Sequence, residues 1–162
     1  MMTGIRRTAA ALVAAAAIAA LPIAPAVAAP ESSLEARTSA IIAAHPGGVE
    51  LAPGVIAWEK GAVTLTLDGA VSPQSVGTCL TGQYCAWSGT GYTGTKLTFT
   101  ACSSGGTSSS VALLSGLVRS SANARTSGTV RAVNGSSVIY SMSAGTGNSA
   151  NGATLTALVC YS

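Results

Sequence analysis

The stretch from Cys79 to Cys102 constrains the fold of this chain more than any other segment. It contains three of the four cysteines, one of the two tryptophans, two of the four tyrosines and the only phenylalanine. Aromatic residues make up only 4% of the 162 residues, so this concentration marks the place where a core forms. Residues 84–87 are apolar and aromatic and predict a strand. Residues 96–100 alternate between polar and apolar side chains and predict a second one.

A glycine-rich turn, residues 88–94, joins these two predicted strands. Gly94 lies where a bent hairpin needs a positive φ angle, which glycine adopts without strain. Trp87, Tyr92 and Gly94 form the pattern aromatic-x4-aromatic-x-Gly. This pattern, followed by an alternating strand, resembles the folded-hairpin signature of βγ-crystallin Greek-key motifs.

The cysteines around the turn narrow the resemblance. The pattern Cys79-x5-Cys85-x-Trp87, with Cys102 after the second strand, resembles the secreted actinobacterial peptidase-inhibitor family whose founding member blocks metalloproteases. The likeness covers roughly residues 79–160. It implies an all-β, βγ-crystallin-like sandwich of two Greek-key motifs over residues 79–162. It also implies inhibition of a secreted zinc metalloprotease.

The second Greek key is expected from a partial internal repeat. Tyr140-x4-Gly145-x-Gly147 echoes the first motif, with the second aromatic residue replaced by glycine. Before it, Asn134-Gly135 lies between two alternating segments, 129–133 and 136–142, which predicts a hairpin with a type I′ turn.

Three other segments of this half are less distinctive. Residues 154–160 predict the last strand, and residues 111–118 fit a short helix or a buried strand equally well. Residues 103–110 are polar and are expected to form a flexible connector.

The four cysteines are expected to form disulfides, because an even number in a secreted chain is typical of a disulfide framework. Four cysteines allow three connectivities. We favour Cys79–Cys85, which closes a tight loop, and Cys102–Cys160, which ties the first Greek key to the last strand. A zinc site is the rival interpretation. Zinc sites favour Cys-x2-Cys pairs, often with histidine, and this pattern is missing here.

Residues 1–28 have the pattern of a secretory signal peptide. Arg6 and Arg7 precede an apolar run over 9–21, and Ala26-Val-Ala28 offers a small-x-small cleavage site. The apolar run is short and alanine-rich for a membrane span. We therefore expect a secreted, extracellular protein with no membrane segment after cleavage.

Residues 29–78 resemble the leader or pro-segment of secreted proteins of this kind. A helix is predicted over 30–45, strands over 49–67, and a linker over 70–78. The segment can be trimmed on maturation or remain as an additional β-hairpin, and both alternatives stay open.

The chemistry of residues 69–162 argues against an enzyme. This stretch contains no Asp, Glu or His, and its charged residues are Lys96, Arg119, Arg125 and Arg131. General acid–base catalysis needs a group that titrates near the working pH, and a serine or cysteine nucleophile needs a nearby base. We therefore expect no catalytic residues and no cofactor. The formal charge of +3 is small, so no nucleic-acid partner is expected, and a monomer is the default state.

Calcium binding is expected to be weak or absent. The βγ-crystallin calcium segment is matched here only by Asn123 and Ser127, whereas Ala124 and Gly128 depart from it. Calcium favours anionic oxygen ligands, which this half of the chain lacks.

Recognition of another protein is the function that remains. A disulfide-stapled sandwich can hold loops rigid, and a rigid loop loses little entropy on binding. The candidate binding segments are 88–93 and 120–126, and their candidate contact residues are Ser88, Gly89, Thr90, Gly91, Asn123 and Arg125. The alternatives are a crystallin-like structural or cell-surface module without inhibitory activity, and a killer-toxin-like antimicrobial protein.

Overall fold

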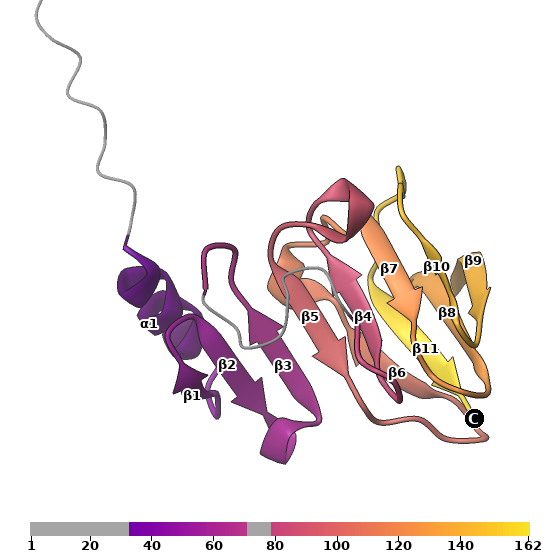
Figure 1. The fold of residues 1–162 in the computed structure, drawn as a ribbon, viewed down its shortest axis with the longest axis horizontal. Helices are drawn as coiled ribbons and strands as arrows, with labels where there is room; N and C mark the ends of the chain where they lie inside the picture. Colours follow the sequence, from indigo (N-terminus) through magenta and orange to yellow (C-terminus); the bar gives the residue numbers. More distant parts are fainter. Residues whose placement is uncertain (1–32, 71–78) are drawn as a thin grey trace, which may run out of the picture. The chain divides into compact units, whose positions relative to one another are not determined.

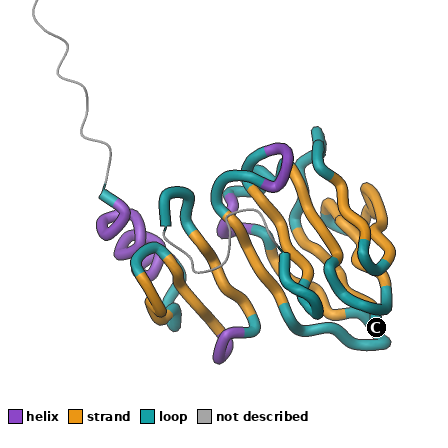
Figure 2. The backbone as a smooth tube through the Cα atoms, in the orientation of Figure 1, coloured by secondary structure: helices purple, strands orange, loops and turns teal. Residues whose placement is uncertain are grey.

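The computed structural model describes residues 33–70 and 79–162, and these residues fold mainly into β-strands (Figures 1 and 2). They form two antiparallel sheets and one short α-helix. The predicted signal peptide and most of the predicted linker lie outside the described residues. The helix is α1 (Leu34–Ala44), and the strands are β1 (Val49–Ala52), β2 (Val55–Trp58), β3 (Val63–Thr66), β4 (Tyr84–Trp87), β5 (Lys96–Phe99), β6 (Thr107–Ser110), β7 (Ser120–Asn123), β8 (Thr129–Asn134), β9 (Ser137–Ser143), β10 (Thr146–Asn148) and β11 (Ala157–Tyr161).

The two sheets have different sizes. Sheet A has seven strands in the order β1-β2-β3-β5-β4-β7-β10, and sheet B has four in the order β6-β11-β8-β9. The hairpin of β2 and β3 continues sheet A, because β3 pairs with β5 in the register Val63↔Phe99 and Leu65↔Leu97. Residues 49–66 are therefore part of the same sheet as the cysteine-rich half.

Strands 4 to 11 are shared between the sheets in a regular way. Sheet A holds β4, β5 and β7 together with β10 at its edge, and sheet B holds β8, β9 and β11 together with β6 at its edge. We call β4–β7 the first half of this domain and β8–β11 the second half. Each sheet thus takes three strands from one half and one strand from the other half. The exchange of β6 and β10 interlocks the two halves, so that neither half has a sheet of its own.

One apolar core joins the two sheets. Alternate residues on each strand face the same side, so the inward residues of both sheets meet and are fully or nearly fully buried. Sheet A contributes Ile56, Leu65, Tyr84, Ala86, Leu97 and Phe99, and sheet B contributes Val130, Ala132, Met142, Leu158 and Cys160. The rings of Tyr84 and Phe99 are stacked with their centroids 5.2 Å apart.

Several elements agree with the patterns of the sequence. The strands predicted over 84–87 and 96–100 are β4 and β5, and the hairpin predicted over 129–142 is formed by β8 and β9. The helix predicted over 30–45 begins only at Leu34, because the Ser33 side chain caps it by accepting a hydrogen bond from the Ala36 N–H at 3.2 Å.

Two local predictions are corrected by the structure, and one open alternative is decided. Residues 107–110 are not a connector but the edge strand β6, because pairing with β11 overrides the low strand propensity of serine. Of the short helix and the buried strand considered for residues 111–118, the structure has the short helix, a 3₁₀ turn over residues 112–114. The β8–β9 turn is not type I′, since only the first of its two central residues, Gly135 and Ser136, has a positive φ angle.

The predicted repeat does not match the arrangement of the strands. Trp87 ends β4, the first strand of its half, whereas Tyr140 lies inside β9, the second strand of the other half. Gly147 lies on the edge strand β10 and pairs with Ala122. Residues 88–94 join the first two strands of the first half, and the corresponding turn of the second half is the short β8–β9 turn.

The disulfides have the favoured connectivity. Cys79 is bonded to Cys85 and Cys102 to Cys160, with sequence separations of 6 and 58 residues. The longer cross-link joins Cys102, in the segment that leads from β5 of sheet A to β6 of sheet B, to Cys160 in β11 of sheet B. No helix within residues 33–70 and 79–162 is long and apolar enough to cross a membrane.

Loss of the two disulfides is expected to have unequal effects. The chain-entropy model assigns about 4 kcal/mol to the loop closed by Cys102 and Cys160 and about 2 kcal/mol to the loop closed by Cys79 and Cys85. Urea unfolding of the Cys102→Ala/Cys160→Ala and Cys79→Ala/Cys85→Ala variants measures both values. An equal loss in the two variants would contradict this ranking.

Candidate functional site

The loop between β4 and β5, residues 88–95, is one exposed part of the region that the sequence singled out, and residues 80–82 are another. Its two sides are joined by main-chain hydrogen bonds, from the Ser88 N–H to the Thr95 carbonyl at 3.0 Å and from the Gly89 N–H to the Thr93 carbonyl at 2.9 Å. The tip is a tight turn over Thr90–Tyr92, in which Gly91 and Tyr92 both have left-handed φ angles of +63°. The loop is therefore a folded structure and not an open excursion of the chain.

Ser120, the first residue of β7, holds this loop through two hydrogen bonds. Its hydroxyl donates a hydrogen bond to the Gly89 carbonyl at 2.7 Å and accepts one from the Tyr92 N–H at 3.0 Å. The side chain is completely buried, so both bonds are shielded from water. No local pattern in the sequence marks Ser120 for this role, because the contact joins residues about 30 positions apart.

Close contacts fix the remaining part of the loop. The Trp87 and Tyr92 rings meet edge to face with centroids 5.2 Å apart. Gly94 has a φ angle of +79°, as predicted, and a Cβ atom there would lie only 2.6 Å from the Ser88 hydroxyl oxygen. A Cβ atom at Gly147 would lie 2.8 Å from the Tyr92 hydroxyl oxygen. Both glycines are thus required for close packing around the loop.

The tip of the loop is rigid and exposed at the same time. Thr90 and Gly91 are exposed, whereas Ser88 and Gly89 are half-buried. The Gly91 N–H donates a hydrogen bond to the Ser149 carbonyl at 2.8 Å, which ties the tip to the segment after β10. Of the predicted contact residues, these four lie together, with Thr90 and Gly91 the most accessible.

Most of the second predicted binding segment, residues 120–126, is not a loop, and only residues 124–126 lie outside a strand. Residues 120–123 are strand β7, and the Asn123 side chain is 0% exposed. Its amide nitrogen donates to the Met142 carbonyl at 3.2 Å, and its amide oxygen accepts from the Arg125 N–H at 3.3 Å. Burial and these bonds remove Asn123 from the set of contact residues. The Asn123 amide oxygen, which belongs to the degenerate calcium segment noted above, is one of the groups engaged in these bonds.

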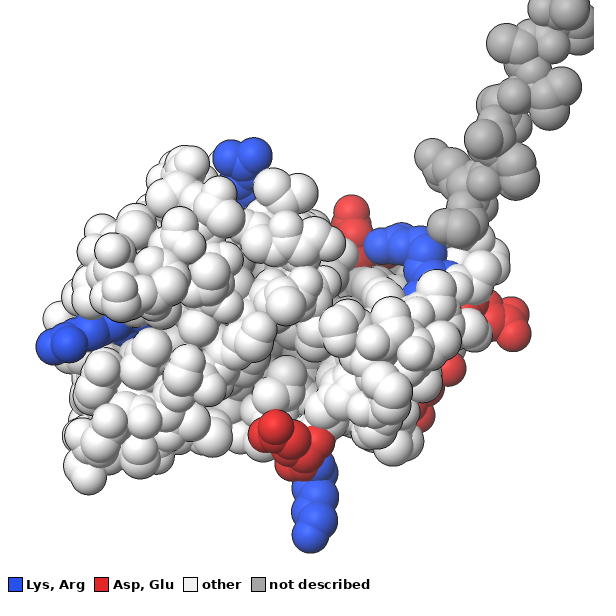
Figure 3. All heavy atoms as spheres, turned by 180° about the vertical axis from the view of Figure 1, so that it is seen from behind, with Lys and Arg blue, Asp and Glu red and all other residues white. Residues whose placement is uncertain are grey.

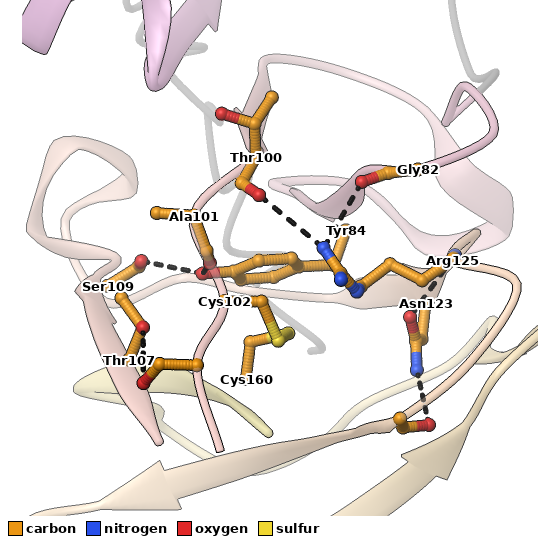
Figure 4. Close-up of a disulfide and its surroundings, with 12 residues drawn as sticks. Gly82, Tyr84, Thr100, Ala101, Cys102, Thr107, Ser109, Asn123, Arg125 and Cys160 are labelled. Atoms are coloured by element: carbon orange, nitrogen blue, oxygen red, sulfur yellow. Dashed lines mark hydrogen bonds between the residues drawn. A yellow bond between two sulfur atoms is a disulfide. The ribbon is translucent and has the colours of Figure 1, made fainter. Parts of the chain in front are cut away.

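The Arg125 side chain is also engaged in hydrogen bonds within the protein (Figure 4). Its guanidinium donates to the carbonyls of Gly82 and Thr100, each at 3.4 Å. It lies near the start of β4, because Asn123 pairs with Tyr84, while Ser120 pairs with Trp87 at the other end. Arg125 therefore lies at the end of β4 opposite the 88–95 loop, whereas Ser120, at the start of the same predicted segment, lies beside that loop.

Two tyrosine hydroxyls form hydrogen bonds between the sheets; Tyr84 is completely buried and Tyr140 is half-buried. The Tyr84 hydroxyl donates to the Ala101 carbonyl at 2.9 Å and lies 2.8 Å from the Ser109 hydroxyl, and the Tyr140 hydroxyl lies 2.7 Å from that of Ser121. Burial raises the pKa of both tyrosines above 10.0, although the neighbouring serine hydroxyls act in the opposite direction. Burial also lowers the pKa of Lys96 from 10.5.

Charged and metal-binding groups are sparse over the described residues. The acidic residues among them are Glu35, Glu50, Glu59 and Asp68, all outside the cysteine-rich half. Figure 3 shows one face, on which most of the surface carries no charged side chain. Within residues 33–70 and 79–162, no three His, Cys, Asp or Glu side chains are grouped so that they could hold a metal ion.

Replacement of Ser120 by alanine is expected to loosen the 88–95 loop. The variant leaves the Tyr92 N–H and the Gly89 carbonyl without their buried partner, which costs about 1–3 kcal/mol of unfolding free energy. Ser127→Ala is a matched control, since Ser127 is exposed. Urea unfolding measures the loss, and amide hydrogen exchange at Tyr92 should accelerate in the Ser120→Ala variant alone. Unchanged exchange would show that Ser120 does not hold the loop.

The tyrosine pKa shifts predict a loss of stability in alkali. A tyrosine pKa that is higher in the folded state means that folding favours the neutral phenol. This contribution is complete below the unfolded pKa near 10 and disappears as the pH rises through the folded pKa. The pKa of Lys96 is shifted in the opposite direction, but this shift is present both in the wild type and in the tyrosine variant described next. Between about pH 9 and about pH 11.5, the Tyr84→Phe/Tyr140→Phe variant should lose less unfolding free energy than the wild type. A parallel loss in both proteins would refute the assignment.

Comparison with protein families places these features in a known group. A family model described as peptidase inhibitor family I36 matches residues 72–153, which is about half of the chain and includes the 88–95 loop and both strands beside it. Comparisons with curated proteins and with solved structures returned no match. The family is one of inhibitors and not of enzymes, in agreement with the absence of acid–base residues in this half. The protein belongs to peptidase inhibitor family I36.

Proposed function

We propose that this protein is a secreted inhibitor of an extracellular zinc metalloprotease, and that the rigid tip of the 88–95 loop enters the active-site cleft. Membership of the inhibitor family supports a peptidase as the partner. The two disulfides, which are typical of proteins in oxidising compartments, support secretion.

The main structural support for this proposal is that hydrogen bonds order the 88–95 loop in the free protein. An inhibitor must present main chain to the protease without paying a large entropic penalty for ordering it. Here the hydrogen bonds of Gly89, Gly91 and Tyr92 hold the loop before binding, while Thr90 and Gly91 remain accessible. Binding then orders few additional torsions.

We also propose that strands 4 to 11 form two Greek keys of the βγ-crystallin type. The exchange of β6 and β10 between the sheets supports this assignment, as does the folded turn before Gly94. The crystallin-like arrangement would leave the first turn free at one end of the sandwich, where it can meet a partner.

Residues 29–78 are proposed to remain attached to the inhibitory half. The pairing of β3 with β5 supports this, and Leu65 of β3 is completely buried in the core shared with that half. Proteolytic removal would expose both the edge of β5 and the apolar surface that Leu65 covers.

The proposed function is tested by inhibition assays with the secreted protein. We expect inhibition of a thermolysin-like zinc metalloprotease at micromolar concentration or below, and a higher inhibition constant for Thr90→Glu by at least about tenfold, since a charge is forced into the cleft. Thr81→Glu, an exposed threonine near the opposite end of β4, is the control and should inhibit like the wild type.

Two outcomes would contradict these statements separately. If the wild-type protein does not slow the metalloprotease at micromolar concentration, the inhibitory function is wrong. If it does, and Thr90→Glu is as effective as Thr81→Glu, the function stands and the tip of the 88–95 loop is not in the cleft.

A further inference from the structure

Leu117 is a large apolar residue that the fold leaves exposed on a fixed backbone. Its side chain is 56% exposed, whereas the next residue, Val118, is 1% exposed and belongs to the core. The preceding residues Ser115 and Gly116 have φ angles of +52° and +71° and end the 3₁₀ helix Ala112–Leu114. These two left-handed residues turn the chain. The residues that follow, 117–119, belong to no helix or strand and lie directly before β7.

Hydrogen bonds hold this short segment on both sides. The Leu117 N–H donates to the Leu114 carbonyl at 2.9 Å, and the Arg119 N–H donates to the Trp87 carbonyl at 2.8 Å. Asn151, which is itself buried, donates from its side-chain amide to the Val118 carbonyl at 2.9 Å and from its N–H to the Arg119 carbonyl at 2.6 Å. The main chain beside Leu117 is therefore set before any partner binds.

The same segment is continuous with the 88–95 loop. Arg119 is bonded to Trp87, the residue before that loop, and Ser120 is bonded to Gly89 inside it. The Gly91 N–H reaches Ser149, two residues before Asn151. Residues 88–93, 115–119 and 148–152 thus form one surface at this end of sheet A, on which Arg119 is the one charged residue.

Other exposed apolar residues lack this setting. Val49 and Leu51 lie in the edge strand β1, and Val138 and Ile139 lie in the edge strand β9. Leu80 lies in the loop closed by the Cys79–Cys85 disulfide, before the start of β4 and away from the 88–95 loop. Single exposed apolar residues are common on protein surfaces and need no function. Leu117 differs because it lies in the segment that is bonded to the 88–95 loop, on the surface proposed to meet the peptidase.

We infer that Leu117 fills the primary specificity pocket of the inhibited peptidase, and that this pocket is apolar. The inference rests on the proposed inhibitory function and extends it to the specificity of the target. A few residues that enter well-packed pockets supply most of the binding energy of an interface, and a backbone that is fixed beforehand lowers the cost of ordering them. A leucine side chain has no polar atom, so a pocket that carries a buried charge for basic or acidic side chains would lose a partner on binding it.

The inference is tested with substitutions at Leu117 in the full secreted chain. Leu117→Ala should raise the inhibition constant for a metalloprotease with an apolar pocket by about thirtyfold, as expected for an anchor residue. Leu117→Met keeps the length and apolar character of the side chain and should stay within about threefold of the wild type. Val138→Ala, which trims another exposed aliphatic residue (51% exposed), is the control and should leave inhibition unchanged.

The outcomes separate this inference from the proposed function. Leu117→Ala should melt at the wild-type temperature because its side chain is exposed. If that variant inhibits as well as the wild type while Thr90→Glu inhibits poorly, the anchor role is wrong and the inhibitory function stands. The anchor role is equally wrong if Leu117→Met is as impaired as Leu117→Ala in a folded protein. If the wild type inhibits no metalloprotease, both statements fall together.

Discussion

The central position of β4 is the constraint on which the rest of the structure depends. Its four residues, Tyr84–Trp87, are buried, and the strand pairs on one side with β5 and on the other with β7. The pair Trp87↔Lys96 sets the length of the 88–95 loop, and the pair Trp87↔Ser120 places the Ser120 hydroxyl under that loop. A shift of register by one residue would reverse the faces of the strand. The loop would then lose its support at the same time as the core loses Tyr84.

The parts of the fold that the sequence predicted are those in which neighbours along the chain decide the structure. Alternation over residues 96–100 is a local property, and so is the turn signal at Asn134-Gly135. The predicted turn type was wrong, because Gly135 and Ser136 are its central residues and only Gly135 has a positive φ angle. The requirement for a positive φ angle at Gly94 was predicted from its place in the motif. For the cysteines, a short spacing and the expected order of strands were sufficient to favour the connectivity that the structure has.

The parts that were missed depend on contacts between distant residues. Strand β6 is a run of threonine and serine, and only its pairing with β11 makes it a strand. Asn123 is typical of an exposed loop by residue type, yet its amide satisfies carbonyl and N–H groups inside the domain. The structure replaces the predicted pair of loops by a different surface, in which the 88–95 loop is joined to residues 115–119 and 148–152. The sequence alone contains no signal for that juxtaposition, because the bonds that create it involve main-chain atoms.

The scarcity of charge limits how this surface can bind. Only 8% of the chain is charged, and residues 69–162 contain no acid, so long-range attraction does little to accelerate encounter with a partner. Tight inhibition would then have to come from slow dissociation, which depends on shape, apolar contact and a backbone that needs no reordering. The bonds of Ser120 and Asn151 provide the last of these conditions. A surface of this kind should bind almost independently of salt concentration, unlike one that relies on complementary charges.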